Sequence, residues 1–240
     1  MRSEIARRGL LAALALAPAS CLLNWDSLRP DDAGAFDASE EPAHDVTAPE
    51  TGPDASDAGT DGASCQIALV INELQADGPQ GPSDEFVELR NGASCGGSLL
   101  NWGLRYSSAG GSAPSQLWTG QAGDTIAAHG YVLLGGYAFQ VPDGGTVLGR
   151  ISTDLNGSLS KNGGGVGLFD PLGTLVDGVA YETLTTSSHP FIRPADAGSG
   201  GGAPNPPSGK SIARTPDGTN TGTNATDFQI AQSATPGYAN

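Results

Sequence analysis

Short runs in which apolar and polar residues alternate are the main pattern of the chain after residue 65. In FVELRN, residues 86–91, Val87 and Leu89 alternate with charged neighbours, which predicts a strand with one buried and one solvated face. In NWGLRYS, residues 101–107, Trp102 and Leu104 share a face with Tyr106. These periods of two residues indicate β-strands.

Further along the chain the pattern predicts a buried strand and a hairpin. YVLL, residues 131–134, is apolar on both faces and should be central in a sheet; it follows a short strand at residues 124–126 and a turn at His129 and Gly130. Residues 165–169 and 175–181 flank the sequence DPLG, which places Pro171 at the second position of a β-turn. Seven to nine short strands of this kind predict an all-β sandwich.

Composition agrees with this class and excludes one kind of partner. The chain contains 36 Gly and 17 Pro, which interrupt long helices. Its formal net charge is −15 and its pI is about 4.2. Because nucleic-acid binding domains carry a basic face, no nucleic-acid partner is expected.

Residues 21–64 differ in kind from the rest of the chain. From residue 22 to residue 64 there are 11 acidic residues and one basic residue, Arg29, and apolar periodicity is lacking. Such a segment has too little apolar surface to offset the entropy of ordering, so a disordered, charge-extended linker is expected. It is interpreted either as a spacer that holds the domain away from a surface or as a passive connection.

The first 20 residues have the layout of a signal peptide. Three arginines precede a short apolar run at residues 9–17 and then small residues. This run is too short to cross a bilayer, which takes about 20 residues. Cys21 follows Ala19 and Ser20 and resembles the lipidated cysteine of bacterial lipoproteins, although Pro18 departs from that motif; Leu22 favours the outer membrane. A cleaved secretory signal with an incidental Cys21 is the alternative, and Arg7 and Arg8 only faintly resemble a twin-arginine signal.

The remaining cysteines predict a disulfide. If Cys21 carries lipid, Cys65 and Cys95 remain. An antiparallel pairing of residues 69–76 with residues 85–91 that is centred at residue 80 sets Val70 opposite Arg90, and the same register sets Cys65 opposite Cys95. A cross-link there would stabilise the domain by roughly 3–4 kcal/mol. Two unpaired buried thiols are the alternative.

Eight sequence segments in order resemble the lamin tail domain, an immunoglobulin-like β-sandwich. They are Asn72 with Glu73, residues 84–91, 102–104, 125–134, 159–173 and 211–218, Asp227 with Phe228, and residues 235–240. The resemblance spans nearly all of residues 66–240, with a departure at residues 185–209 that predicts a long exposed loop.

This resemblance implies a fold and an accessory role rather than catalysis. The first and last strands of the domain should pair. Asn72, Asn91 and Asn240 are interpreted as residues that fix turns. By their family positions, Glu73, Glu88 and Arg214 are predicted to form a network on adjacent strands.

Three patterns are weak signals of chemistry. GASCG, residues 92–96, matches the G-x-S-x-G pattern of hydrolases, but the sequence after Ser94 has no helical periodicity to build a nucleophile elbow. PSGKS, which ends at Lys210 and Ser211, lacks the first glycine of a phosphate loop. His44, His129 and His189 have no spacing that suits a metal or a triad, and each is interpreted as solvated.

Two further patterns offer ligand sites. The oxygen-rich loop PDGTNTGTNATD offers weak Ca²⁺ candidates, although turn formation explains the same residue types: Asp217, Asn220, Asn224 and Asp227. Trp118 and Tyr137 are either exposed aromatics of a sugar-binding face or packing residues.

The sequence thus predicts three parts: a lipoprotein signal peptide (1–20), an acidic linker (21–64) and a lamin-tail-like domain (65–240). The predicted function is a non-catalytic cell-envelope lipoprotein, without a cofactor, that binds an unknown protein or glycan and is attached to a membrane by its lipid. The first alternative is a carbohydrate- or calcium-dependent module accessory to secreted hydrolases or nucleases. The second is a cryptic hydrolase built around Ser94.

Overall fold

The structure is a computed structural model and describes residues 65–153, 156–181, 189–191 and 202–240. The expected signal peptide, the acidic linker, Cys21 and His44 lie outside the described residues. Within the described part the fold is an all-β sandwich, as the sequence predicts.

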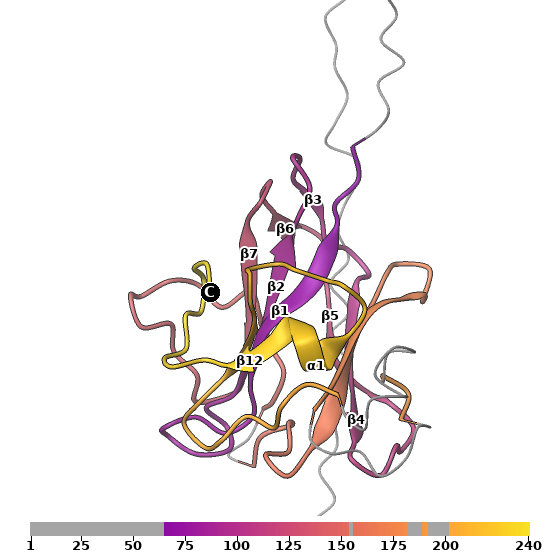
Figure 1. The fold of residues 1–240 in the computed structure, drawn as a ribbon. Coiled ribbons are helices and arrows are strands. Elements are labelled where there is room, and N and C mark those ends of the chain that lie inside the picture. Colours follow the sequence, from indigo (N-terminus) through magenta and orange to yellow (C-terminus); the bar gives the residue numbers. More distant parts are fainter. Residues whose placement is uncertain (1–64, 154–155, 182–188, 192–201) are drawn as a thin grey trace, which may run out of the picture. The chain divides into compact units, whose positions relative to one another are not determined.

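The first layer is a six-stranded sheet in the order β12-β11-β1-β2-β7-β8. Its strands are β1 (Leu69–Gln75), β2 (Phe86–Asn91), β7 (Tyr131–Gly135), β8 (Gly149–Arg150), β11 (Ile212–Arg214) and β12 (Phe228–Ile230). β1 pairs with β11, so the earliest and latest parts of the domain do meet. Figure 1 shows the purple strand β1 and the yellow strand β12, which are separated in the sheet by β11, and the short helix α1 (Asn224–Asp227) that leads into β12.

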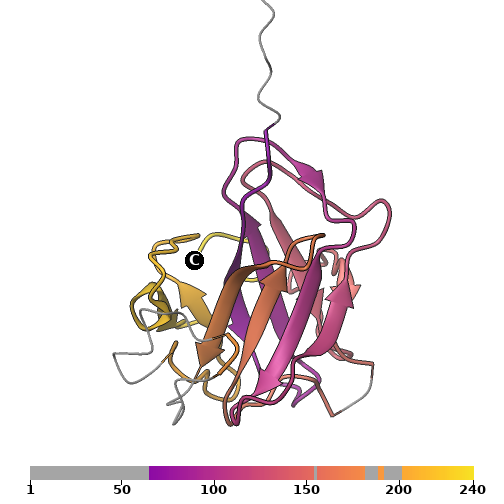
Figure 2. The same cartoon turned by 90° about the vertical axis from the view of Figure 1, so that its right-hand side faces the viewer.

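The second layer is a four-stranded antiparallel sheet in the order β10-β9-β4-β5. It consists of β4 (Gly103–Ser108), β5 (Ser115–Thr119), β9 (Gly164–Phe169) and β10 (Leu175–Tyr181). Figure 2 shows this sheet in front and β1 behind it. The strands β9 and β10 and their turn confirm the predicted hairpin, since the Gly173 amide donates to the Asp170 carbonyl.

Three two-residue strands explain why the described residues contain more strands than the seven to nine expected. β3 (Gly97–Ser98) pairs only with β6 (Thr125–Ile126), and β8 adds a short parallel edge to β7. β6 confirms the short strand expected at residues 124–126, whereas alternation alone does not reveal β3 and β8, because a period shows only over several positions.

Apolar side chains fill the space between the layers and also one patch outside them. The main core joins Ile71, Leu89 and Leu134 of the first sheet to Leu104 and Leu168 of the second. A second cluster, Phe86, Leu133 and Phe139, lies apart from this core. Successive residues of a strand point to opposite faces, so YVLL is apolar throughout because each of its faces meets one cluster.

The predicted register is correct for the first half of the hairpin β1–β2. Val70 faces Arg90, and Cys65 and Cys95 form a disulfide, as expected. A bulge between Ile71 and Glu73 then shifts the pairing by one residue, so that Glu73 rather than Asn72 faces Glu88. This bulge gives Asn72 a special position in the site described below.

The described residues of the segment 185–209 correct the prediction of an exposed loop. His189, Phe191 and Ala203 are buried. The Phe191 ring lies over Gly167 and the His189 ring over Gly165, where any side chain on β9 would collide with them. The Ala203 amide donates to the Ala180 carbonyl of β10. These residues therefore pack on the four-stranded sheet.

Candidate functional site

Two buried charged clusters lie around β1, and they are built from different chemistry. The inter-sheet cluster consists of Arg214, Asp177 and Asp227. The strap cluster consists of Asn72, Glu73, Glu88 and Asp217, together with the C-terminal strap, residues 235–240. All of the charged side chains named here except Asp217 are buried.

All three guanidinium nitrogens of Arg214 donate hydrogen bonds inside the protein. Its Nε donates to the Ile71 carbonyl at 2.8 Å. Nη1 donates to the Thr219 carbonyl at 2.7 Å and to Asp227 Oδ2 at 2.9 Å. Nη2 donates to both carboxylate oxygens of Asp177, at 2.9 and 3.2 Å. The guanidinium also stacks 4.5 Å from the centre of the Phe228 ring, so its position is fully determined.

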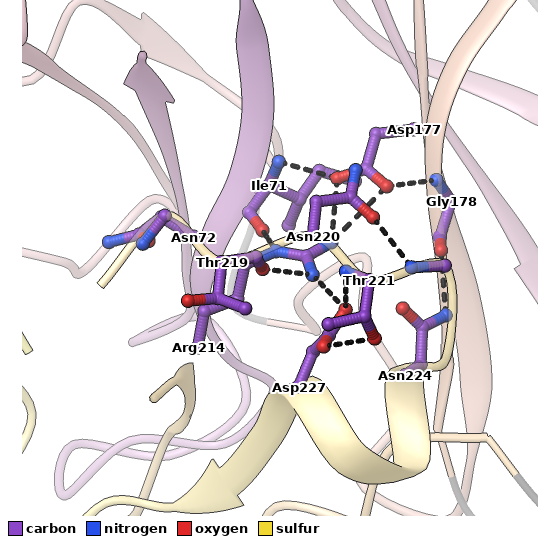
Figure 3. A network of polar contacts seen from close by, with 12 residues as sticks. Ile71, Asn72, Asp177, Gly178, Arg214, Thr219, Asn220, Thr221, Asn224 and Asp227 are labelled. Atoms are coloured by element: carbon purple, nitrogen blue, oxygen red, sulfur yellow. Dashed lines mark hydrogen bonds and ion pairs between the residues drawn. The ribbon is translucent and has the colours of Figure 1, made fainter. Parts of the chain in front are cut away.

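The two aspartates of the inter-sheet cluster reach beyond Arg214. Asp177 accepts the backbone amides of Ile71 and Gly178, both at 2.9 Å. Asp227 accepts the Thr221 amide and hydroxyl at 2.9 and 2.7 Å. Figure 3 shows these bonds between the ribbons of the two layers and α1. The cluster therefore fastens β1, β10, β11 and α1 to one another.

Glu73 and Glu88 are cross-strand neighbours on β1 and β2. Glu73 accepts the Ser211 hydroxyl, and also the Thr235 amide at 3.1 and 3.2 Å and the Thr235 hydroxyl at 3.2 Å. Glu88 accepts Asn72 Nδ2 at 2.8 Å and the Gly237 amide at 2.6 Å. The two carboxyl groups thus hold the strap by its backbone.

Asp217 and Asn72 complete the strap cluster. Asp217 accepts Asn72 Nδ2 at 2.9 Å, the Tyr131 hydroxyl at 2.8 Å and the Asn240 amide at 3.3 Å, and it forms an ion pair with Arg90 Nε at 2.5 Å. Because Asn72 lies in the bulge of β1, its amide group reaches both Glu88 and Asp217.

Burial changes the acidity of both glutamates. Burial raises the pKa of Glu88 from 4.5 to about 8, against the hydrogen bonds from Asn72 and Gly237, which lower it, while Glu73 and Asp217 add repulsion. Burial also raises the pKa of Glu73, against the bonds from Ser211 and Thr235. Every ion pair among the described residues has an aspartate as its acid, so neither glutamate has a cation partner there.

These contacts correct the predicted network of Glu73, Glu88 and Arg214. The two glutamates do lie together, but Arg214 binds Asp177 and Asp227 instead. Sequence reasoning missed Asp177, although a single acid inside the apolar strand LVDGVAY is a signal that could have found it.

A groove of about 410 Å³ runs beside the strap. Tyr131 and Leu133 of β7, Val141 and Asp143 of the following connection, and Pro236 and Tyr238 of the strap line it. The Tyr238 hydroxyl donates to Asp143 at 3.0 Å and joins two of these walls. An apolar floor with tyrosines and one carboxylate at the rim suits a neutral, amphipathic ligand.

The four calcium candidates do not converge. Asp227 belongs to the inter-sheet cluster and Asp217 to the strap cluster. Asn224 donates to the Gly178 carbonyl, and Asn220 accepts the Gly222 amide. Within the described ranges, no group of three or more His, Cys, Asp or Glu residues could hold a metal ion.

The other chemical candidates occupy ordinary structural positions. Ser94 lies in a bend that leads into β3 and not into a helix. Lys210 donates to the Gln232 carbonyl. Trp118 is in the core, whereas Tyr137 is 58% exposed.

The prediction for the histidines is correct for His129, which is exposed in its turn, and wrong for His189. The His189 ring accepts the Phe191 amide at Nδ1 and donates from Nε2 to the Ser108 carbonyl, and burial lowers its pKa.

No protein-family model matches the sequence, and no curated protein is significantly similar to it. The lamin-tail resemblance therefore stays a prediction. Across the residues that the structure describes, no helix is long and apolar enough to cross a membrane.

Proposed function

We propose that this protein is a non-catalytic cell-envelope lipoprotein that displays a lamin-tail-like β-sandwich as a binding or structural module. One observation carries the proposal: the acidic and amide residues of the family-like segments form internal ties. Glu73 and Glu88 hold the strap, and Arg214 holds the two layers together. Residues used in this way specify a fold and are not free to act on a substrate.

The cysteines support the proposed location. The disulfide between Cys65 and Cys95 suits an oxidising compartment. Cys21 lies after a short apolar run and small residues, at the position where a lipid would be attached. The acidic linker would then separate the lipid from the domain.

Metabolic labelling with a fatty-acid analogue, followed by mass spectrometry of the mature N-terminus, tests the anchor. The wild type should begin at Cys21, carry lipid and sediment with membranes. Cys21→Ser should lose the label. The double variant Cys65→Ser/Cys95→Ser is the matched control, because it removes the other two cysteines and should keep the label. A mature chain without lipid would show that the protein is secreted instead.

A neutral glycan is the ligand that the groove beside the strap favours. Tyrosine rings pack against the apolar faces of sugars, and Asp143 and Thr146 offer oxygens to hydroxyl groups. Trp118 cannot serve this role because its side chain is in the core. A protein ligand that binds the same groove is the alternative outcome.

Two tyrosines of equal exposure allow a matched test. Tyr238 is 57% exposed in the groove, and Tyr137 is 58% exposed outside it. On an array of neutral and acidic glycans, Tyr238→Ala should lose the signal and Tyr137→Ala should retain it. Absence of any wild-type signal on the array, combined with a Tyr238-dependent cross-link to an envelope protein, would favour the protein ligand.

A further inference from the structure

We infer that the C-terminal strap is a proton-linked latch. It closes over the carboxyl groups of Glu73 and Glu88 together with one proton, and it opens more often when that proton is lost. The inference concerns how the strap is held and does not depend on the proposed ligand.

The geometry makes the two carboxyl groups the main attachment of the strap. Thr235 and Gly237 direct their backbone amides to Glu73 and Glu88. Near the end of the strap, the Asn240 amide reaches Asp217 at 3.3 Å, and the Asn240 side chain reaches the carbonyls of Asn72 and Arg214 at 3.4 Å. The bond to Glu88 is thus the shortest in the set.

The charges around this pair make full ionisation unfavourable. Glu73 comes from β1 and Glu88 from β2, and Asp217, from the turn after β11, adds a third carboxylate. Arg90 is the cation nearest to the cluster and pairs with Asp217. The β7 hydroxyl of Tyr131 also binds Asp217, and Tyr238 of the strap binds Asp143. Two buried carboxylates that lack a cation repel each other, so the closed state favours one shared proton.

The direction of the pH effect follows from this burial. In the closed strap the pKa of Glu88 is about 8, whereas a solvated glutamate has the ordinary value of 4.5. A raised pKa means that closure takes up a proton. Closure is therefore fully favoured below about pH 4.5, and its equilibrium constant falls by up to tenfold per pH unit until about pH 8.

The latch also controls the shape of the groove. Pro236, Gly237 and Tyr238 form one of its walls, so an open strap removes that wall. Ala234, the residue before the strap, packs against the cluster of Phe86, Leu133 and Phe139. The outer surface of the six-stranded sheet therefore differs between the two states.

Amide hydrogen exchange of the full mature chain, measured by NMR between pH 5.5 and 7.5, tests the latch. After correction for intrinsic exchange, the protection factors of Thr235 and Gly237 should fall by up to about 100-fold over these two pH units. The Ile71 amide, which is bound to Asp177, should keep its protection factor.

Two variants test whether the pH dependence comes from the carboxyl pair or from another acid near the strap. In Glu88→Gln the side chain at position 88 is uncharged at every pH, so the hydrogen-exchange protection of the strap should become independent of pH. Asp143→Asn also removes an acid that contacts the strap, but it leaves the pair intact and should keep the wild-type slope. Protection that stays constant or rises with pH in the wild type overturns the latch, even if Glu88→Gln fails to fold. An unchanged slope in folded Glu88→Gln overturns it as well.

Discussion

The inter-sheet cluster and the strap cluster both bury acidic side chains, but only the inter-sheet cluster pairs its buried acids with a cation. In the inter-sheet cluster, Asp177 and Asp227 surround a guanidinium whose three nitrogens all donate hydrogen bonds. In the strap cluster, Glu73 and Glu88 receive only neutral N–H and O–H donors. The first arrangement is stable as ions, and the second favours a proton.

The surroundings of each cluster determine what must move before its buried charge can reach water. Four elements of both layers enclose Arg214, so its charges can reach water only if the sandwich opens. The strap covers Glu88, so the charge of Glu88 can reach water when the strap alone moves. The buried charges of the inter-sheet cluster therefore hold the two layers together, whereas those of the strap cluster respond to movement of the strap alone.

Removal of the Arg214 guanidinium should cause the largest loss in the free energy of unfolding. Arg214→Met keeps most of the side-chain volume but leaves two buried carboxylates without a cation. We expect a loss of about 3–5 kcal/mol in the free energy of unfolding, measured by urea denaturation of the full mature chain. Arg214→Lys restores the charge without the five-donor geometry and should recover only part of the loss. If Arg214→Met were as stable as the wild type, the inter-sheet cluster would not be what holds the two layers together.

Sequence reasoning reached the parts of the fold that depend on local pattern and simple register. The hairpin of β9 and β10 and the disulfide both follow from alternation and residue spacing. The bulge at Asn72 was not predicted, although the core-facing residues of the strand change phase there, from Leu69 and Ile71 to Leu74 and Ala76.

The pairing of Arg214 with Asp177 was beyond the sequence for a different reason. Asp177 lies 37 residues before it and in the other sheet, and only the packing of the layers brings the two together. His189 was misassigned in the same way, since its segment folds back onto glycines of β9. Side chains that connect distant elements leave little local signal.

The second prediction concerns stability against pH. The raised pKa of Glu88 contributes stability that is fully present below about pH 4.5 and is lost as the pH rises through about 8. Because the strap can open and solvate this group, the loss cannot exceed the free energy that holds the strap, about 1–3 kcal/mol for a few such bonds. Urea midpoints of the wild type should therefore decrease between pH 5 and pH 8.

Glu88→Gln provides the control for this effect. Its midpoint should change less than that of the wild type over the same range, because the amide does not titrate. Equal changes in both proteins would assign the pH dependence to other groups and would remove the contrast between the two clusters.

The smallest expected effect comes from the Thr235 hydroxyl. Thr235→Val keeps the size of the side chain and the backbone amide that Glu73 accepts, but it removes the hydroxyl bonds to Glu73 and Asn240. We expect a loss of about 0.5–1 kcal/mol, seen as a small decrease in Tm. Ser233→Ala, at an exposed position just before the strap, should leave Tm unchanged. If Thr235→Val instead destabilised the protein as much as Arg214→Met, the strap would be part of the cooperative core and not a segment that opens by itself.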